Sequence, residues 1–143
     1  MKARRLRAQP QFEALRSSPP LARTEHFVLH GLALQSPAGP TVAQLPALFP
    51  GQGLWVGAVT PKRWAKRAVT RNLIRRQIFN MAEVWMPALR ASLPQHTVFL
   101  VRMKAAYAAE QFRSAASLAL RQVVRVELER LFARAADLNR GKS

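Results

Sequence analysis

The densest group of side chains that could do chemistry is a basic stretch over residues 61–79, PKRWAKRAVTRNLIRRQIF. It holds five arginines and two lysines and no acidic residue. Arginine presents a planar fork of N–H donors that binds phosphate oxygens in pairs and stacks on bases. Asn72 adds an amide that can both donate and accept toward a base edge or a sugar hydroxyl. This chemistry predicts a polyanionic partner, and we expect RNA.

If the stretch is one helix, four of its arginines are spaced four residues apart and form a single ladder. These are Arg63, Arg67, Arg71 and Arg75. Like charges at this spacing repel by about 0.2–0.5 kcal/mol per pair in an isolated helix. A run of Lys and Arg is also commonly a solvated helix face, and that alternative stays open. Solvated faces usually mix both signs of charge, however, so the lack of Glu and Asp favours a binding surface.

Groups suited to catalysis or metal binding are sparse elsewhere. The seven carboxylates are scattered, and no pair has a spacing that suggests general acid–base chemistry. His26 and His30 would lie about 13 Å apart on a strand, too far for one metal, and His96 is isolated. All three are interpreted as structural or surface histidines. The chain has no phosphate-binding GxxxxGK[ST] or GxGxxG sequence. We therefore expect no catalytic residue and no protein metal site.

Composition bounds the architecture and the partner. The 143 residues are 49% hydrophobic, which predicts a single domain over 1–143 with a modest core. A net charge of +16 predicts binding to nucleic acid first and to an anionic membrane surface second. The absence of cysteine excludes disulfides and thiolate chemistry and is compatible with a reducing cytosol. No apolar run reaches the 18 or more residues of a membrane span.

The local patterns predict a mixture of helices and strands. Three helices are expected, over 10–16, over 61–79 with an extension to Trp85 and a further turn from Pro87, and over 108–135. Three strands are expected, over 25–32, 54–60 and 97–103. Residues 35–53 hold four prolines and three glycines and are predicted to be a flexible loop or insertion, and 136–143 a tail. The last helix is predicted to bury Phe112, Ala116, Leu120, Val123, Val124, Leu128, Leu131 and Phe132.

The basic stretch resembles that of the protein subunit of bacterial ribonuclease P. The family pattern K-[KR]-x-x-[KR]-R-A-x-x-R-N-x-x-[KR]-R follows an apolar strand with a glycine, here Gly57. It is met by Lys62, Arg63, Lys66, Arg67, Ala68, Arg71, Asn72, Arg75 and Arg76. The segments FEALRSS, EHFVLH and VFLVR and the final helix also come in the family's order, so the resemblance covers about residues 6–134.

The chain departs from the family pattern in a few places. Pro61 replaces a small residue, Trp64 is unusually bulky, the 35–53 loop is long, and Phe12 is the only aromatic residue of the first helix. The Arg-rich, acid-poor N-terminus also has the composition of an organellar transit peptide. Because the resemblance begins inside this segment, we expect it to belong to the mature protein.

The resemblance implies an α+β fold: a small, ribosomal-protein-like two-layer α/β sandwich with a mixed four-stranded sheet and a left-handed βαβ crossover. The fourth strand is expected within residues 33–48. The implied function is that of the non-catalytic protein subunit of an endoribonuclease ribonucleoprotein. This subunit binds the catalytic RNA and the 5′ leader of precursor tRNA. Hydrolysis would belong to the RNA and to Mg²⁺ held mainly by it. We expect a monomeric, cytoplasmic protein in a 1:1 complex with the RNA, away from membranes.

The resemblance also implies roles for particular residues. Contacts to the catalytic RNA are expected from Lys62, Arg63, Lys66, Arg67, Arg71, Asn72, Arg75 and Arg76. Leader contacts are expected from Phe12, Phe27, Arg102 and Lys104, with base stacking worth about 1–3 kcal/mol per base. The alternative for both phenylalanines is an ordinary place in the core. A ribosomal or general RNA-binding protein is the alternative function, although it explains the charge without explaining the motif's spacing.

Overall fold

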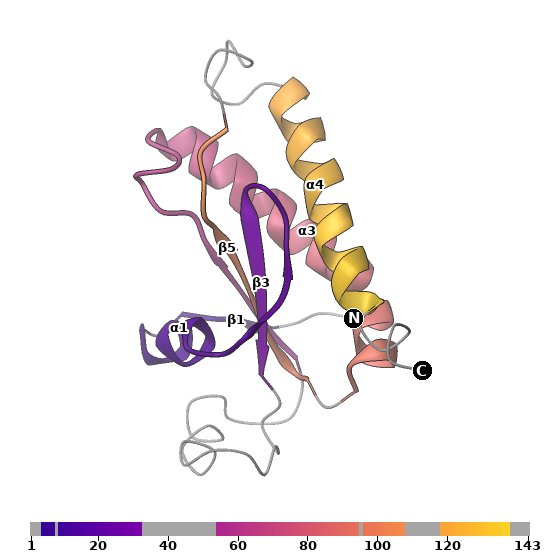
Figure 1. The fold of residues 1–143 in the computed structure, drawn as a ribbon. Helices are drawn as coiled ribbons and strands as arrows, with labels where there is room; N and C mark the ends of the chain where they lie inside the picture. Colours follow the sequence, from indigo (N-terminus) through magenta and orange to yellow (C-terminus); the bar gives the residue numbers. More distant parts are fainter. Residues whose placement is uncertain (1–3, 8, 33–53, 95, 108–117, 138–143) are drawn as a thin grey trace.

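The protein folds around one mixed β-sheet with helices on both faces (Figure 1). The computed structural model describes residues 4–7, 9–32, 54–94, 96–107 and 118–137. Its strands are β1 (Arg4–Arg5), β2 (Pro20–Arg23), β3 (Phe27–Leu32), β4 (Trp55–Val59) and β5 (Val98–Met103). Its helices are α1 (Gln9–Arg16), α3 (Ala68–Ser92) and α4 (Leu118–Ala136). Within the described ranges, no helix is both long and apolar enough to cross a membrane.

The strand order is β1-β4-β5-β3-β2, with parallel pairing of β1, β4 and β5 and antiparallel pairing of β5, β3 and β2. Helix α3 makes the crossover between the parallel neighbours β4 and β5. The predicted mixed α+β fold is confirmed, but the sheet has five strands rather than four. Strand β1 is only two residues of a basic segment, and β2 begins at Pro20, shortly after the first helix. The strand expected within 33–48 and the 35–53 loop lie outside the described residues.

Alternation along the central strand β5 separates two apolar layers. Phe99, Val101 and Met103 join the large core beneath α3 and α4, whereas Val98 and Leu100 join a smaller cluster with Leu15 of α1. Because the first four residues of β5 are buried on both faces, Val98–Val101 form a continuous apolar run, as interior strands of such sheets usually do, and the half-buried Arg102 interrupts it.

Helix α3 begins at Ala68, so the prediction of one helix from Pro61 is wrong. The N–H groups of Trp64 and Ala65 both donate to the Pro61 carbonyl, at 3.0 and 3.1 Å, which makes a separate turn. Arg67 then adopts an extended conformation, with φ −90° and ψ 137°. The predicted four-arginine ladder is therefore interrupted: Arg63 and Arg67 lie before the helix, and only Arg71 and Arg75 keep the four-residue helical spacing.

The far end of α3 also differs from the prediction. The helix continues past Trp85 and contains Pro87 within its last turns, ending at Ser92. Pro87 is exposed, so its ring stands on the water side of the helix, away from the core. The run is therefore one helix rather than a helix followed by a separate turn.

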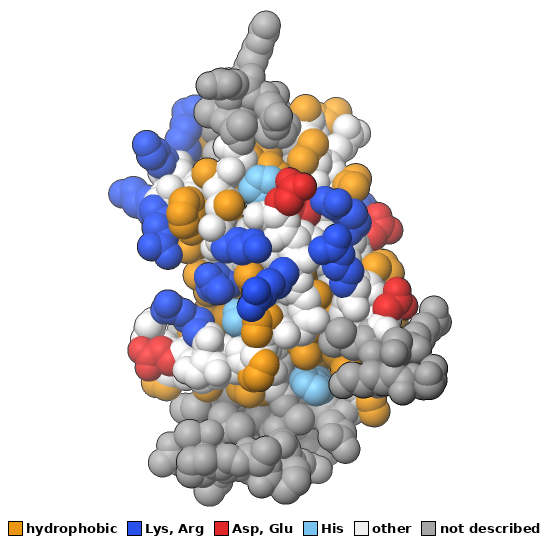
Figure 2. Space-filling model, viewed as in Figure 1, with side chains coloured by type: hydrophobic (Ala, Val, Ile, Leu, Met, Phe, Trp, Pro, Cys, Tyr) orange, Lys and Arg blue, Asp and Glu red, His pale blue; other side chains and the backbone are white. Residues whose placement is uncertain are grey.

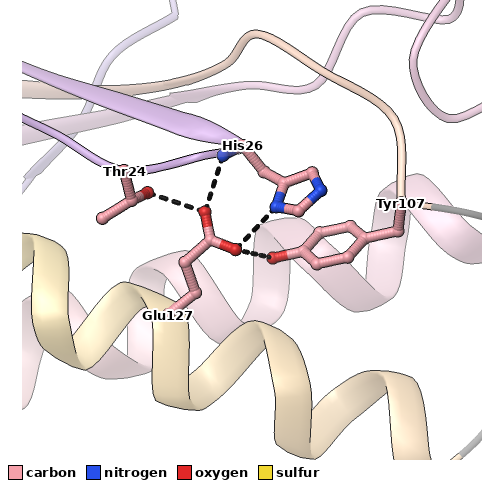
Figure 3. Close-up of polar contacts among 4 residues, drawn as sticks. All are labelled: Thr24, His26, Tyr107 and Glu127. Atoms are coloured by element: carbon pink, nitrogen blue, oxygen red, sulfur yellow. Dashed lines mark hydrogen bonds and ion pairs between the residues drawn. The ribbon is translucent and has the colours of Figure 1, made fainter.

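A buried carboxylate ties α4 to the sheet (Figure 3). One oxygen of Glu127 accepts from the Thr24 hydroxyl and the His26 N–H, both at 2.7 Å. The other accepts from Nδ1 of His26 at 2.7 Å and from the Tyr107 hydroxyl at 2.9 Å. Burial raises the pKa of Glu127, but these hydrogen bonds lower it more, and the net pKa lies below the usual 4.5. The Tyr107 pKa is raised by burial and by the Glu127 charge.

Helix α4 buries most of its predicted apolar face. Leu120, Val124, Leu128, Leu131 and Phe132 are each at most 3% exposed, which confirms these assignments. Val123 is 42% exposed, so its assignment is wrong: it lies one helical step from Val124, which occupies the buried line. Phe112 and Ala116 lie outside the described residues.

Candidate nucleic-acid interface

The first candidate surface, here called the basic turn surface, combines the 61–67 turn with the start of α3. Its exposed polar side chains are Lys62, Arg63, Lys66, Arg67, Asn72, Arg75 and Arg76. Figure 2 shows Lys and Arg side chains gathered at the upper left, the side on which this turn lies in Figure 1. The surface carries cationic groups and an amide without an acidic residue, a composition suited to phosphate and sugar contacts.

Arg71 has a different role from the other arginines of this surface. It is half-buried, and its Nη1 donates to the carbonyl oxygens of Ala65 and Lys66, at 3.0 and 2.9 Å. The guanidinium thereby holds the turn against the first residues of the helix, while Ala65 is buried in the core. Arg71 therefore positions the turn.

The helical part of the surface is arranged in two short columns. Arg71 lies one turn before Arg75, and Asn72 lies one turn before Arg76. The N–H groups of Thr70 and Arg71 bond to the Arg67 carbonyl, and the Arg67 side chain makes no capping bond. The positive end of the helix dipole therefore adds to the arginine charges at the same place.

The second candidate surface, here called the arginine row, crosses the α1 side of the sheet. Arg23 of β2 pairs with Val28 of β3, Val28 pairs with Arg102 of β5, and Arg102 pairs with Val59 of β4. Paired residues point to the same face, so Arg23 and Arg102 share a face with Cα atoms about 10 Å apart, two strand spacings. Leu100 and Val98 follow on the same face, packed with Leu15 of α1, so the helix covers the neighbouring rows.

Four arginines from separate elements influence one another around this row. The pKa of Arg102 is lowered by burial and then by the charges of Arg16, Arg63 and Arg23. Arg16 ends α1, Arg23 ends β2, and Arg63 comes from the 61–67 turn. Mutual repulsion of this kind is relieved by a bound polyanion, because its phosphates neutralise several cations at once.

His30 lies beneath this group and is 3% exposed. Its Nδ1 donates to the Ser18 carbonyl at 3.1 Å, whereas Nε2 has no hydrogen-bond partner among the described residues. Burial lowers the His30 pKa, and the nearby Arg102, Arg23 and Arg16 lower it further, against the opposing effect of the Ser18 bond. A neutral ring with a protonated Nδ1 leaves Nε2 as a buried acceptor without a partner among the described residues.

Comparison with known proteins settles the family. The Ribonuclease P family profile matches residues 1–136. The chain is 31% identical over 131 residues to the "Ribonuclease P protein component" of Ralstonia pickettii (strain 12J), covering 92% of this chain and 78% of that protein. It is 32% identical over 135 residues to the protein of the same name from Burkholderia pseudomallei (strain 1106a), covering 94% and 84%. The chain belongs to the ribonuclease P protein family.

Family membership confirms the resemblance seen in the sequence, and the structure separates the residues predicted to bind the leader. Phe27 is 0% exposed and packs in the large core on the opposite face from the arginine row, which is the alternative position expected for it, and its leader contact stays a prediction. Phe12 is half-buried against the α1 cluster. Arg102 lies in the row, and Lys104 follows β5, with its N–H bonded to the His26 carbonyl at 2.8 Å. The contacts of Phe12, Arg102 and Lys104 with RNA stay predictions.

Sequence reasoning missed three residues of the ribonuclease P protein that the fold brings to the arginine row. Arg23 belongs to no quoted motif, and Arg16 lies in the FEALRSS segment without an assigned role, so only strand pairing and the end of α1 place them beside Arg102. His30 was interpreted as an ordinary structural or surface histidine, and no sequence signal shows that its Nε2 is left without a partner. The alternation along β3 puts Val28, His30 and Leu32 on one face of the strand. Since Val28 pairs with Arg102, that face is the one that carries Arg102.

Proposed function

We propose that this chain is the protein subunit of a ribonuclease P ribonucleoprotein, which binds the catalytic RNA and the 5′ leader of precursor tRNA. In this role it assists removal of the leader, which makes the mature 5′ end of the tRNA. The observation that carries the proposal is that the basic turn surface and the arginine row meet at Arg63. Arg63 is exposed on the turn and lies within electrostatic range of Arg102. An RNA bound to the basic turn surface and a second RNA bound to the arginine row would therefore approach each other at Arg63.

The catalytic RNA is assigned to the basic turn surface. Arg75 and Arg76 donate to phosphates, Asn72 contacts a sugar hydroxyl or base edge, and Arg71 holds the turn in place. Each phosphate contact displaces a counterion from the RNA. The logarithm of the binding constant therefore falls linearly with the logarithm of the salt concentration, with a slope of about 0.7–0.9 per contact. Such contacts orient the RNA without reading its sequence.

The leader is assigned to the arginine row. Arg102 and Arg23 bind its phosphates, and the half-buried Phe12 offers a ring edge or face for stacking. The row thus offers phosphate contacts that do not depend on the base sequence, with stacking on Phe12 beside them.

Mg²⁺ is assigned to the RNA subunit. The described residues do not fit the ion, because they contain no group of three or more His, Cys, Asp or Glu side chains that could hold it. The part of this chain is electrostatic: a protein of charge +16 placed between two polyanions lowers their mutual repulsion. The 1:1 stoichiometry and the cytoplasmic location stay predictions.

A binding experiment with the ribonuclease P RNA tests this assignment. The variants are Arg75→Ala/Arg76→Ala on α3 and a control of equal charge change, Arg121→Ala/Arg125→Ala, on the exposed side of α4. We expect the α3 variant to reduce the salt slope of binding by about 1.4–1.8, for two lost phosphate contacts, with little change for the control. Equal losses in both variants would favour a general RNA-binding protein.

A further inference from the structure

Arg134 of α4 reaches the β2 edge of the sheet. Among the described strands, β2 is the outermost on this side, and Arg23 is its last residue. Helix α4 packs against β2 and β3 from the face opposite α1. Nη1 of Arg134 donates to the backbone carbonyl of Arg23, so its guanidinium is held at the strand's end. The positive charge of the arginine row therefore continues beyond Arg23, because Arg134 places a further cation at the sheet edge.

The charge continues along α4. Arg130 and Arg134 are both exposed and lie one helical turn apart, on the same side of the helix. Glu127, the nearby buried carboxylate, has its oxygens occupied by four donors. Glu25, in the connection between β2 and β3, and Asp137, one helical turn after Arg134, are exposed acids of this region. Figure 2 shows blue side chains continuing across the middle of this face to the side of α4, with only scattered red ones.

We propose that Arg134 and Arg130 form an edge subsite for single-stranded RNA, which receives leader nucleotides after they pass Arg23. The inference rests on the proposed function, since it needs the leader to lie on the arginine row. A strand of RNA that leaves the row at Arg23 meets Arg134 next, because the carbonyl contact holds that guanidinium at the same point. One N–H of the guanidinium is used in this contact, and the others are directed to phosphate oxygens.

The chemistry of the edge subsite favours leader length over leader sequence. Guanidinium groups on phosphates carry no base information. The subsite also lies at a strand edge beyond the row, so only a leader long enough to cross the row can reach it. The edge subsite should therefore add affinity for long leaders of any sequence and none for short ones.

The test uses the holoenzyme reconstituted with ribonuclease P RNA and two precursor tRNAs, with leaders of about 4 and about 16 nucleotides, the range of single-strand site sizes. We expect Arg134→Ala to weaken binding of the long-leader precursor about 2- to 5-fold, the effect of one exposed ion pair, and to leave the short one unchanged. Arg134→Lys should keep most of the affinity. Arg121→Ala is the matched control, because Arg121 is exposed on the same helix about 20 Å away.

Two outcomes would overturn the inference. In the first, Arg134→Ala binds each precursor as tightly as wild type does. In the second, Arg134→Ala weakens binding of the short-leader and the long-leader precursor by the same factor. Arg102→Ala separates this failure from failure of the proposed function, because it should weaken both leaders if the row binds RNA. If Arg134→Ala does not fold, Arg130→Ala replaces it in the test. This substitution removes a charge one helical turn away and leaves the hydrogen bond to the Arg23 carbonyl in place. Thermal unfolding of each variant shows which of them is folded.

Discussion

The buried Glu127 offers the sharpest test of what holds the C-terminal helix to the sheet. Its replacement by Leu keeps a side chain of similar size and removes the acceptor for four donors, from Thr24, His26 and Tyr107. Breaking a buried charged network costs about 3–5 kcal/mol of unfolding free energy. For a domain of this size, each kcal/mol lowers Tm by about 2–4 °C, so we expect a loss of about 6–20 °C at neutral pH.

The measurement is thermal unfolding followed by circular dichroism, with Glu129→Gln as the control. Glu129 is exposed on the same helix, and its neutralisation should change the unfolding free energy by no more than about 0.5 kcal/mol. Glu127→Gln should fall between wild type and Glu127→Leu, because one amide oxygen still accepts and the Tyr107 hydroxyl can rotate to accept. A Tm for Glu127→Leu within about 1 °C of wild type would refute the reasoning, since a shift of that size is below 1 kcal/mol.

The pH dependence of the same variant has a definite sign. The pKa of Glu127 is lower in the folded protein than its usual 4.5, so its ionised form is favoured by folding. Its contribution is present above pH 4.5 and is lost as the pH falls through the folded pKa. The Tm difference between wild type and Glu127→Leu should therefore shrink below pH 4.5. A difference that grows on acidification would contradict the assignment of a charged, hydrogen-bonded carboxylate.

Three further predictions concern the two RNA surfaces. Arg71→Ala should make the amides of the 61–67 turn exchange hydrogen faster, and it should weaken RNA binding more than Arg71→Lys does. Equal protection of these amides in wild type and in Arg71→Ala would exclude the positioning role. Phe27→Ala should lower the unfolding free energy by about 3–5 kcal/mol, as core Phe truncations do, and a folded Phe27→Leu protein that loses leader affinity alone would restore the stacking role. His30 should titrate below its usual 6.5 in free protein by NMR, because burial lowers its pKa, and an unshifted or raised value would contradict its buried, arginine-flanked setting.

Much of the fold could be predicted from the sequence because its signals are local. The three longer strands lie where apolar alternation and continuous apolar runs place them, within one or two residues at each end. Strands β1 and β2 were missed because two arginines and a proline-led segment become strands only through pairing with β4 and β3. Tertiary context decides such short edges.

The candidate site divides in the same way. The basic turn surface was visible in the sequence as a motif, but no local pattern shows the break at Arg67 or the bond from Arg71 to the carbonyl of the buried Ala65. The arginine row could not be predicted, because residues from α1, β2 and the 61–67 turn meet only in the folded sheet. The same holds for Glu127, whose donors come from Thr24 and His26, about a hundred residues away, and from Tyr107 in the segment that follows β5.

The central claim is that this chain activates a catalytic RNA through α3. The direct measurement is cleavage of a 5′-extended precursor tRNA by ribonuclease P RNA at low, near-physiological magnesium, without protein, with wild type, and with Arg75→Ala/Arg76→Ala. Strong stimulation by wild type that is largely lost in the variant is the predicted result. Equal stimulation by both proteins would move the contact away from α3. Tight RNA binding without any stimulation would contradict the claim and leave a general RNA-binding protein as the better account.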